Sequence, residues 1–349
     1  MKKDPKKPAS EQEVIELFAR IFSEEEPPDD LLVGIGDDAA VVEPGTDPES
    51  KVVLTADMLV EDIDFTRSIH SPYDIGWRVA VANLSDIAAM GATPRWGICT
   101  LAVPEDITIE WLTDFGKGLK APMEENGAMI IGGDLSRSPD RIVVSMSLVG
   151  ETTGPILRRS GARLGDYIAV TGSLGGSSAG LALLKEGEAK VSEDVARKVK
   201  QAHLRPQPRI WAGTVIAGNP GIHTLMDISD GLGVDLGRLC SASRVGARLR
   251  EEFIPVDESV LKVAEALERD PLEFINGGED FELLFTGTRE GIEYVATVLA
   301  GDPRQPPVTI IGEIIDWPFG LNLLRRDQTV VDPAKLGWDH FRKTGRSFI

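Results

Sequence analysis

The spacing of hydrophobic residues predicts a protein of mixed α/β type. Short apolar and β-branched runs predict strands at 51–59, 97–104, 128–136 and 140–151. Between them, 74–92 (DIGWRVAVANLSDIAAMGA) and 108–127 (TIEWLTDFGKGLKAPMEENG) carry apolar residues at the three- and four-residue spacing of a helix. Gly91 and Gly127 stand where these two helices would end. Strands and helices that alternate in this way indicate an α/β or α+β fold.

The stretch ETTGP at 151–155 marks a boundary between two domains. Behind it, the same kind of pattern predicts strands at 166–172, 223–229, 281–287 and 308–314, and helices at 180–187 and 230–243. A chain of 349 residues also has about the length of two domains. We expect a flexible tail at 1–9, an N-terminal domain at 10–153 whose first helix is capped by Ser10, and a C-terminal domain at 154–349.

The net charge of -19 argues against a nucleic-acid partner and against an anionic membrane surface, because both require a basic footprint. With only two cysteines, the chain has no disulfide framework and no thiolate metal site, which fits a cytoplasmic location. The first ten residues, MKKDPKKPAS, are not followed by the apolar stretch of a signal peptide. No apolar run is long enough to cross a bilayer, so we expect no membrane partner.

Five stretches place an aspartate beside a strand end, a helix or a glycine turn. They are GIGDDAA (34–40), TADMLVEDIDF (55–65), NLSDIAAMGA (83–92), GGDLSR (132–137) and DISDGL (227–232). Each one alone is explained by a helix cap or an Asx-turn. Together they favour a cation site, because Asp86 lies inside an apolar helix and Asp227 ends an apolar strand, where an unpaired carboxylate is costly. Oxygen donors in a chain with four scattered histidines favour magnesium over zinc, and magnesium held by carboxylates usually serves phosphate chemistry.

Glycines beside these acids are typical of a nucleotide site. Gly132 and Gly133 would let the backbone approach a nucleotide closely, and Gly231 at a helix start would offer amide donors to an anion. The stretch GSLGGSSAG (172–180) allows two interpretations, a phosphate-binding loop or a plain strand-to-helix turn. Its lack of a lysine favours the turn, and the chain contains no GxxxxGK[ST] motif.

Seven motifs carry a more specific signal. GIGDDAAVV, NLSDIAAMGA, IIGGDLSR, RRSGARLGD, DISDGL, GGEDFELLF and GWDHF occur in this order between Gly34 and Phe341. In this the sequence resembles the thiamine-monophosphate kinases, which belong to the AIR-synthetase-like ATP-binding superfamily. GIGDD and DISDGL are typical of the superfamily as a whole, whereas GGEDFEL and GWDHF together point to the kinases.

The resemblance implies a two-domain AIR-synthetase-like fold and the ATP-dependent phosphorylation of thiamine monophosphate to thiamine diphosphate. An N-terminal mixed sheet with helices would bind ATP and several magnesium ions and would pair with a second copy in a homodimer. A C-terminal α/β domain would contribute to binding thiamine monophosphate. The implied metal ligands are Asp38, Thr55, Asp57, Asp86, Asp134, Asp227 and Asp230. The implied ATP contacts are Gly133, Asp134, Arg159 and Ser229, and Asp230 and Arg159 are the implied catalytic residues. The implied contacts to the thiamine moiety are Asp64, Glu279 and Trp338.

Two positions depart from the family pattern. Ala56 stands where a hydroxyl is common, which leaves one metal contact to the backbone. Asp64 stands where the family usually has a histidine that touches substrate. Two roles are open for Asp64: it approaches the cationic thiazolium ring, or it caps the strand.

The implied reaction needs no general base, because the acceptor is a phosphate oxygen that is already ionised at neutral pH. Magnesium and positioning would overcome the repulsion between two polyanions, and Arg159 would stabilise charge on the transferred group. In the GDD stretch, Asp38 would bind metal while Asp37 turns away into local hydrogen bonds.

Two alternatives remain: another enzyme of the superfamily, and a non-catalytic nucleotide-binding member. Selenophosphate synthetase needs a reactive residue near the N-terminus, and the first cysteine here is Cys99. The hydrogenase-maturation ATPase ends in a cysteine tail, which the ending GRSFI lacks. AIR synthetase stays open on the sequence alone.

Overall fold

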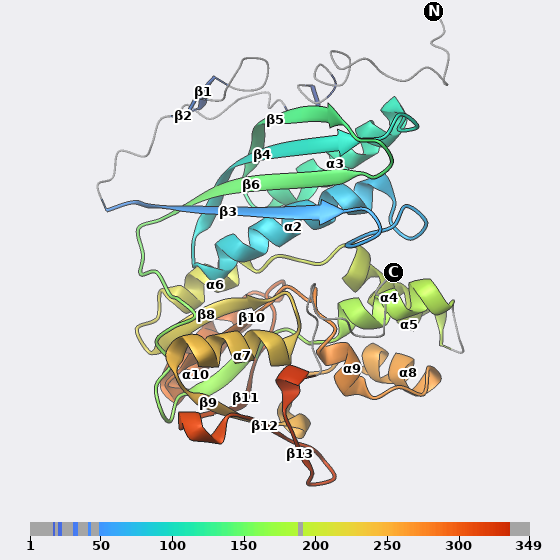
Figure 1. Ribbon diagram of the computed structural model, residues 1–349. Coiled ribbons are helices and arrows are strands. Elements are labelled where there is room, and N and C mark those ends of the chain that lie inside the picture. The colour runs from blue at the N-terminus through green and yellow to red at the C-terminus, as the bar shows by residue number, and fades with distance from the viewer. Residues whose placement is uncertain are drawn as a thin grey trace, which may run out of the picture. The chain divides into compact units, whose positions relative to one another are not determined.

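The computed structural model describes residues 17, 20–22, 31–33, 41–42, 49–187 and 191–335 of the 349-residue chain. These residues fall into two compact units. Unit 1 contains the described residues up to Leu84 together with Thr93–Thr153. Unit 2 contains Ser85–Ala92 together with the described residues from Gly154 onward. Each unit is built around a sheet of its own (Figure 1).

Unit 1 contains a four-stranded mixed sheet with two helices on one of its faces (Figure 1). The strand order is β3-β6-β4-β5, in which β4 and β5 run parallel and the other two pairs run antiparallel. The bounds are β3 (Lys51–Val60), β4 (Thr93–Val103), β5 (Met129–Arg137), β6 (Val143–Thr152), α2 (Pro72–Ala89) and α3 (Ile109–Glu125). A separate pair joins β1 (Leu31–Val33) to β2 (Val41–Val42).

The alternation along β6 identifies the covered face of this sheet. Met146 and Leu148 are fully buried, whereas the intervening Ser147 is exposed. On the neighbouring β3, Leu54 and Met58 belong to the other face, and their side chains are 73% and 59% exposed. One face of the sheet therefore packs on the helices, and the open face carries large apolar side chains.

Unit 2 contains a seven-stranded sheet in the order β13-β12-β9-β11-β7-β10-β8. Its strands are β7 (Tyr167–Thr171), β8 (Ile222–Ile228), β9 (Gly246–Arg250), β10 (Glu282–Gly287), β11 (Val308–Ile315), β12 (Leu321–Leu324) and β13 (Val330–Val331). Its helices are α4 (Gly176–Glu186), α5 (Glu193–Leu204), α6 (Ile210–Ala217), α7 (Leu232–Ser243), α8 (Glu258–Ala266), α9 (Pro271–Ile275) and α10 (Arg289–Ala300). Short 3-10 turns are η1 (Glu251–Phe253), η2 (Trp317–Phe319) and η3 (Pro333–Lys335).

Antiparallel pairing brings several motifs to one end of this sheet. β10 runs antiparallel to both of its neighbours, β7 and β8. The start of β10 therefore lies beside the end of β8 and the end of β7. The stretches GGEDFEL, DISDGL and GSLGG, which are far apart in the sequence, meet at this end of unit 2.

The predicted α/β architecture is confirmed, with shifts at element ends. The strand predicted from 97 begins at Thr93, and the helix predicted from 180 begins at Gly176. The sequence interpretation missed the helices α5, α6, α8, α9 and α10 and the strands β1, β2, β9, β12 and β13. Leu17 and residues 20–22 are helical, whereas the cap at Ser10 and the tail at 1–9 lie outside the described residues.

None of the helices in the described part of the chain combines the length and the apolar character needed to cross a membrane.

The crossing of α2 and α3 yields a stability prediction. A Cβ atom on Gly118 would lie 2.0 Å from the carbonyl oxygen of Tyr73, so the two helix backbones touch there. We expect Gly118→Ala to lower the free energy of unfolding by about 1–3 kcal/mol, because backbone atoms must move apart. The measurement is chemical denaturation. Gly237→Ala in α7 is the matched control, because its Cβ would meet only ordinary contacts at 3.4 Å or more, and there alanine should be neutral or stabilising. Equal stability of both variants would contradict the close crossing.

Candidate active site

The predicted site residues of unit 1 lie on β3 and β5. Thr55 and Asp57 pair with Leu148 and Met146 of β6, so their side chains belong to the covered face. Asp134 pairs with Thr100, is exposed, and belongs to the open face. The two strands thus present Asp57 and Asp134 on opposite faces of the sheet.

Gly133 permits close contact between β5 and β4. A Cβ atom at this position would lie 2.0 Å from the carbonyl oxygen of Cys99. Any larger residue would push the strands apart and move the neighbouring Asp134. Strand packing therefore explains the glycine at position 133 without any contact to a nucleotide.

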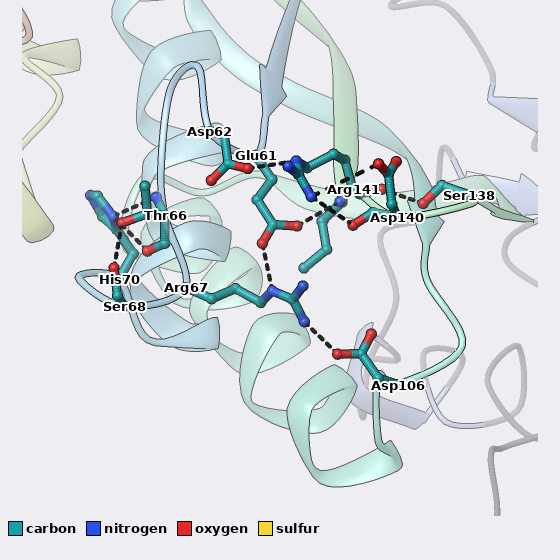
Figure 2. A network of polar contacts seen from close by, with 11 residues as sticks. Glu61, Asp62, Thr66, Arg67, Ser68, His70, Asp106, Ser138, Asp140 and Arg141 are labelled. Atoms are coloured by element: carbon teal, nitrogen blue, oxygen red, sulfur yellow. Dashed lines mark hydrogen bonds and ion pairs between the residues drawn. The ribbon is translucent and has the colours of Figure 1, made fainter. Parts of the chain in front are cut away.

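A network of ion pairs fixes the loop that follows β3 (Figure 2). Glu61 is only 6% exposed; its Oε1 accepts from Nε of Arg67 at 2.5 Å, and its Oε2 accepts from the amide of Ile142 at 2.9 Å. Arg67 also donates from Nη1 to Oδ2 of Asp106 at 2.8 Å. The loop is thereby tied to the start of β6 and to the connection between β4 and α3.

Asp64 lies within this fixed loop. Its Oδ2 accepts from the amide of Val60 at 2.8 Å, at the end of β3. Two residues earlier, Asp62 has a φ of 68° and pairs with Arg141 at 2.5 Å. The contact to Val60 matches the capping role that the sequence left open for Asp64.

In unit 2, the end of α2 meets the end of β8 at a buried carboxylate. Asp227 is 3% exposed, and its Oδ2 accepts from the hydroxyl of Ser85 at 2.8 Å. Burial, together with the negative charges of Asp86 and Asp235, raises the pKa of Asp227 to about 7, whereas the hydrogen bond from Ser85 and the charge of Arg159 oppose the shift. The structure thus brings Asp86 and Asp227 together in a place where negative charge is poorly compensated.

The turn after β8 is held by a second buried acid. Oδ2 of Asp235, in the first turn of α7, accepts from the amides of Ser229 at 3.1 Å and Asp230 at 2.9 Å. Arg238 donates to Oδ1 of Asp235 at 2.8 Å and also pairs with the carboxylate of Asp230. Gly231 has a φ of 99°, and a Cβ there would lie 2.5 Å from the carbonyl oxygen of Asn276. The backbone of the DISDG turn is therefore rigid.

Arg159 is exposed on the segment of unit 2 that precedes β7. Its carbonyl oxygen accepts from the hydroxyl of Ser243 at 3.0 Å, and the carbonyl of Arg158 accepts from the amide of Leu225. These bonds hold the backbone beside β8 and α7 and leave the guanidinium group in the electrostatic neighbourhood of Asp227.

The GGEDF loop packs against the same turn. Glu279 and Phe281 have φ values of 63° and 51°, in the left-handed region that non-glycine residues rarely adopt. The amide of Glu279 donates to the carbonyl of Ser229 at 2.8 Å, and the amide of Phe281 donates to that of Ile228 at 3.0 Å. Such strain occurs preferentially at functional sites.

Asp280 of this loop occupies the amino end of α4. Its carboxylate accepts from the amides of Gly175 at 2.7 Å and Ser177 at 3.1 Å. Burial raises the pKa of Asp280 to about 7. Because a phosphate would need these same amides, the structure favours the turn interpretation of GSLGGSSAG.

A pocket of about 580 Å³ opens beside these loops, within unit 2. Its lining includes Gly172, Arg209, Glu282 and Arg304. Glu282 is buried, and Arg209 pairs with both of its oxygens, at 2.9 and 2.6 Å. Glu282 and Arg209 therefore neutralise each other, whereas Asp257, Glu258 and Arg304 add further charges to the lining.

Not all of the predicted site can be placed. Asp38 and Trp338 lie outside the described residues. Among the residues that are described, no group of three or more histidine, cysteine, aspartate or glutamate side chains stands in an arrangement that could hold a metal. The residues that sequence reasoning missed are Glu61, Asp235, Arg238 and Asp280, which fix the loops. Three of these four lie in or next to the quoted acidic motifs.

Comparison with known sequences places the chain in a family. The AIR synthase related protein family matches with its N-terminal domain over residues 36–152 and with its C-terminal domain over residues 163–317. A thiamine-monophosphate kinase of Rhodopirellula baltica is 36% identical over 291 residues, which cover 82% of this chain and 84% of that protein. One of Aquifex aeolicus is 38% identical over 257 residues, with 73% and 81% covered.

Solved structures agree with this relationship. Thiamine-monophosphate kinase from Stenotrophomonas maltophilia K279a has a TM-score of 0.75 and 32% identity, with 91% of this chain and 96% of that chain covered. AaThiL complexed with AMPPCP and TMP has a TM-score of 0.73 and 34% identity, with 95% and 97% covered. HypE of E. coli, at a TM-score of 0.74 but 19% identity, shares the fold alone. The identity to the kinases and the shared two-domain fold show that this chain belongs to the thiamine-monophosphate kinase family.

Proposed function

We propose that this chain transfers the γ-phosphoryl group of ATP to the phosphate of thiamine monophosphate, giving ADP and thiamine diphosphate. The observation that carries the proposal is the similarity to AaThiL complexed with AMPPCP and TMP, at 34% identity over 95% of this chain. AMPPCP is an analogue of ATP, and we take TMP to be thiamine monophosphate. We place the chain in the cytoplasm, where ATP would be available and where Cys99 and Cys240 would stay reduced.

The donor chemistry fits magnesium. Asp86 is close enough to Asp227 for its negative charge to raise the pKa of Asp227, and the buried carboxylate of Asp227 accepts from the hydroxyl of Ser85. A hard cation with oxygen ligands would compensate this charge. The proposed ligands are Asp38, Thr55, Asp57, Asp86, Asp134, Asp227 and Asp230. Asp57 and Asp134 lie on opposite faces of their sheet, so they would bind different ions. When bound, several magnesium ions would neutralise charge on the phosphates of the two substrates.

The side chains of the chain have binding and positioning roles in this reaction. The acceptor phosphate is already ionised, so no residue has to remove a proton. Arg159, with an exposed side chain near Asp227, would stabilise charge on the transferred phosphoryl group. The amide of Ser229 is engaged by Asp235, which leaves the hydroxyl of Ser229 to meet ATP. Gly133 and Asp134 are the proposed ATP contacts of unit 1.

Substrate recognition requires negative charge for the cationic thiazolium ring. Glu279 is the proposed partner, because its side chain is one-third exposed on a strained loop. Trp338 would add aromatic stacking. Asp64 would contribute only if its carboxylate left the amide of Val60.

The open sheet face of unit 1 supports a homodimer. Val52, Leu54, Met58 and Ile98 expose between 43% and 73% of their side chains on this face. Soluble monomers rarely expose a contiguous apolar patch of this kind. We propose that a second copy of the chain packs here.

The function itself is tested by coupled ADP release with purified protein. Release should depend on thiamine monophosphate and should yield thiamine diphosphate. Aminoimidazole precursors and selenide, the substrates of other superfamily members, should give no stimulation. A rate of ADP release that does not depend on thiamine monophosphate would overturn the proposal.

Asp230→Asn tests the metal assignment. The change keeps shape and removes charge, so kcat should fall by at least about 100-fold if Asp230 holds a cation near the transferred group. The melting temperature should change little. Asp316→Asn is the control, because Asp316 caps η2 with an Oδ1···N distance of 2.9 Å and asparagine caps nearly as well. Near-normal turnover of Asp230→Asn would remove that residue from the metal site.

Leu54→Asp tests the dimer. Placing a charge on the open sheet face should convert the protein to a monomer in light scattering coupled to gel filtration. Leu164→Asp in unit 2, at a side chain that is 64% exposed, should leave the mass unchanged. A wild-type monomer, or a dimer that survives Leu54→Asp, would contradict the proposed interface.

A further inference from the structure

The strained backbone of Glu279 needs support from its surroundings. Its φ of 63° costs a non-glycine residue conformational energy, and the surrounding structure must supply what holds it there. One support is the amide bond to Ser229 described above. The backbone alone does not set the direction of the side chain, which is 33% exposed. A second support should therefore act on the carboxylate itself.

His203 lies next to that carboxylate. It belongs to the last turn of α5 and is 1% exposed. Its Nδ1 is 3.7 Å from Oε2 of Glu279 and 3.0 Å from the hydroxyl oxygen of Ser177. His203 is thus deeply buried beside a proposed substrate-binding group, although the proposed reaction gives it no role.

The position of His203 is fixed by close helix packing. At Gly180 of α4, a Cβ atom would lie 2.1 Å from the carbonyl oxygen of Val199 and 3.0 Å from Cβ of His203. The backbones of α4 and α5 therefore touch, and the imidazole ring has little room to move. A rigid ring is able to impose a direction on a flexible neighbour.

Ser177 connects the ring to the same loop by a second route. Its hydroxyl contacts His203, and its amide donates to Oδ1 of Asp280 at 3.1 Å. The first turn of α4 thus links α5 to the residue that follows Glu279. Lys185, two turns further along α4, also interacts electrostatically with Glu279. The carboxylate of Glu279 is thus 3.7 Å from Nδ1 of His203 and within electrostatic range of Lys185.

We propose that His203 is a positioning residue, which together with Ser177 holds the Glu279 carboxylate in the direction that meets the cationic part of the substrate. The inference rests on the proposed function, in which Glu279 binds the thiazolium ring. His203 touches neither ATP nor the transferred group in this role. Its loss should weaken binding of thiamine monophosphate and leave ATP binding and the phosphoryl transfer step unaffected.

The experiment measures kcat and KM for each substrate, with melting temperature, for wild type and four variants. His203→Leu should raise KM for thiamine monophosphate by about ten-fold, with KM for ATP and kcat within about two-fold. His203→Asn keeps a polar atom at the position of Nδ1 and should restore KM to within about three-fold of wild type. Ser177→Ala should raise KM for thiamine monophosphate by a smaller factor. This variant replaces His203→Leu as the test if His203→Leu does not fold. Glu279→Gln should raise it at least as much as His203→Leu.

A second histidine of unit 2, His223, provides the stability control and is measured alongside. His223 lies 2.9 Å from both oxygens of Asp166, at the start of β8 and away from the GGEDF loop. His223→Leu should lower the melting temperature without changing either KM.

Three results would overturn the inference. An unchanged KM for thiamine monophosphate in folded His203→Leu, while Glu279→Gln raises it, removes His203 from substrate positioning and leaves the proposed function standing. His203 is a packing residue if KM for thiamine monophosphate rises only in proportion to the loss of stability and if His203→Asn does not restore it. No turnover of thiamine monophosphate by wild type refutes the proposed function, and the role of His203 with it.

Discussion

The buried carboxylate of Asp227 is the constraint around which the catalytic end of unit 2 is organised. It ends a strand whose neighbours are apolar, with Asp86 close by and the hydroxyl of Ser85 donating to it. A charge in such a place is unfavourable unless a cation compensates it, which is why its pKa rises to about 7 in the protein alone. A magnesium ion would reverse this balance, because it is a far stronger partner for the ionised form than any group already present.

The other acidic residues around this end of the sheet have a structural role. Asp235 and Asp280 direct their oxygens to backbone amides, and in doing so they fix the DISDG turn and the amino end of α4. In unit 1, Asp64 binds the amide at the end of β3 in the same manner. One group of acids thus builds rigid loops and the other supplies negative charge for cations. A metal-assisted phosphoryl transfer depends on both, because positioning and charge compensation contribute together.

The sequence predicted the order and type of most elements near the site, because strands that end in an acid and a glycine turn have a strong local pattern. It could not separate capping acids from candidate ligands, since Asp235 and Asp227 look alike until their neighbours in space are known. His203 and Ser177 were missed for a similar reason: they are 26 positions apart, and neither lies in a motif of acids. Helix α6 was missed because it is apolar on every side and shows no amphipathic period. Helix α5 is highly polar overall, and its narrow apolar face, with Val195 and Val199, was overlooked.

The role of Asp227 is tested by thermal unfolding of wild type and Asp227→Asn, with and without magnesium and AMPPCP at pH 8. The two ligands together should raise the melting temperature of wild type, because a cation that binds only the folded state stabilises it. Asp227→Asn should gain little from the ligands, and in metal-free buffer it should melt at or above the wild-type temperature, since it buries no charge. A wild type that magnesium and AMPPCP do not stabilise, with an Asp227→Asn variant that melts lower in metal-free buffer, would contradict the claim that the buried carboxylate is built for a cation.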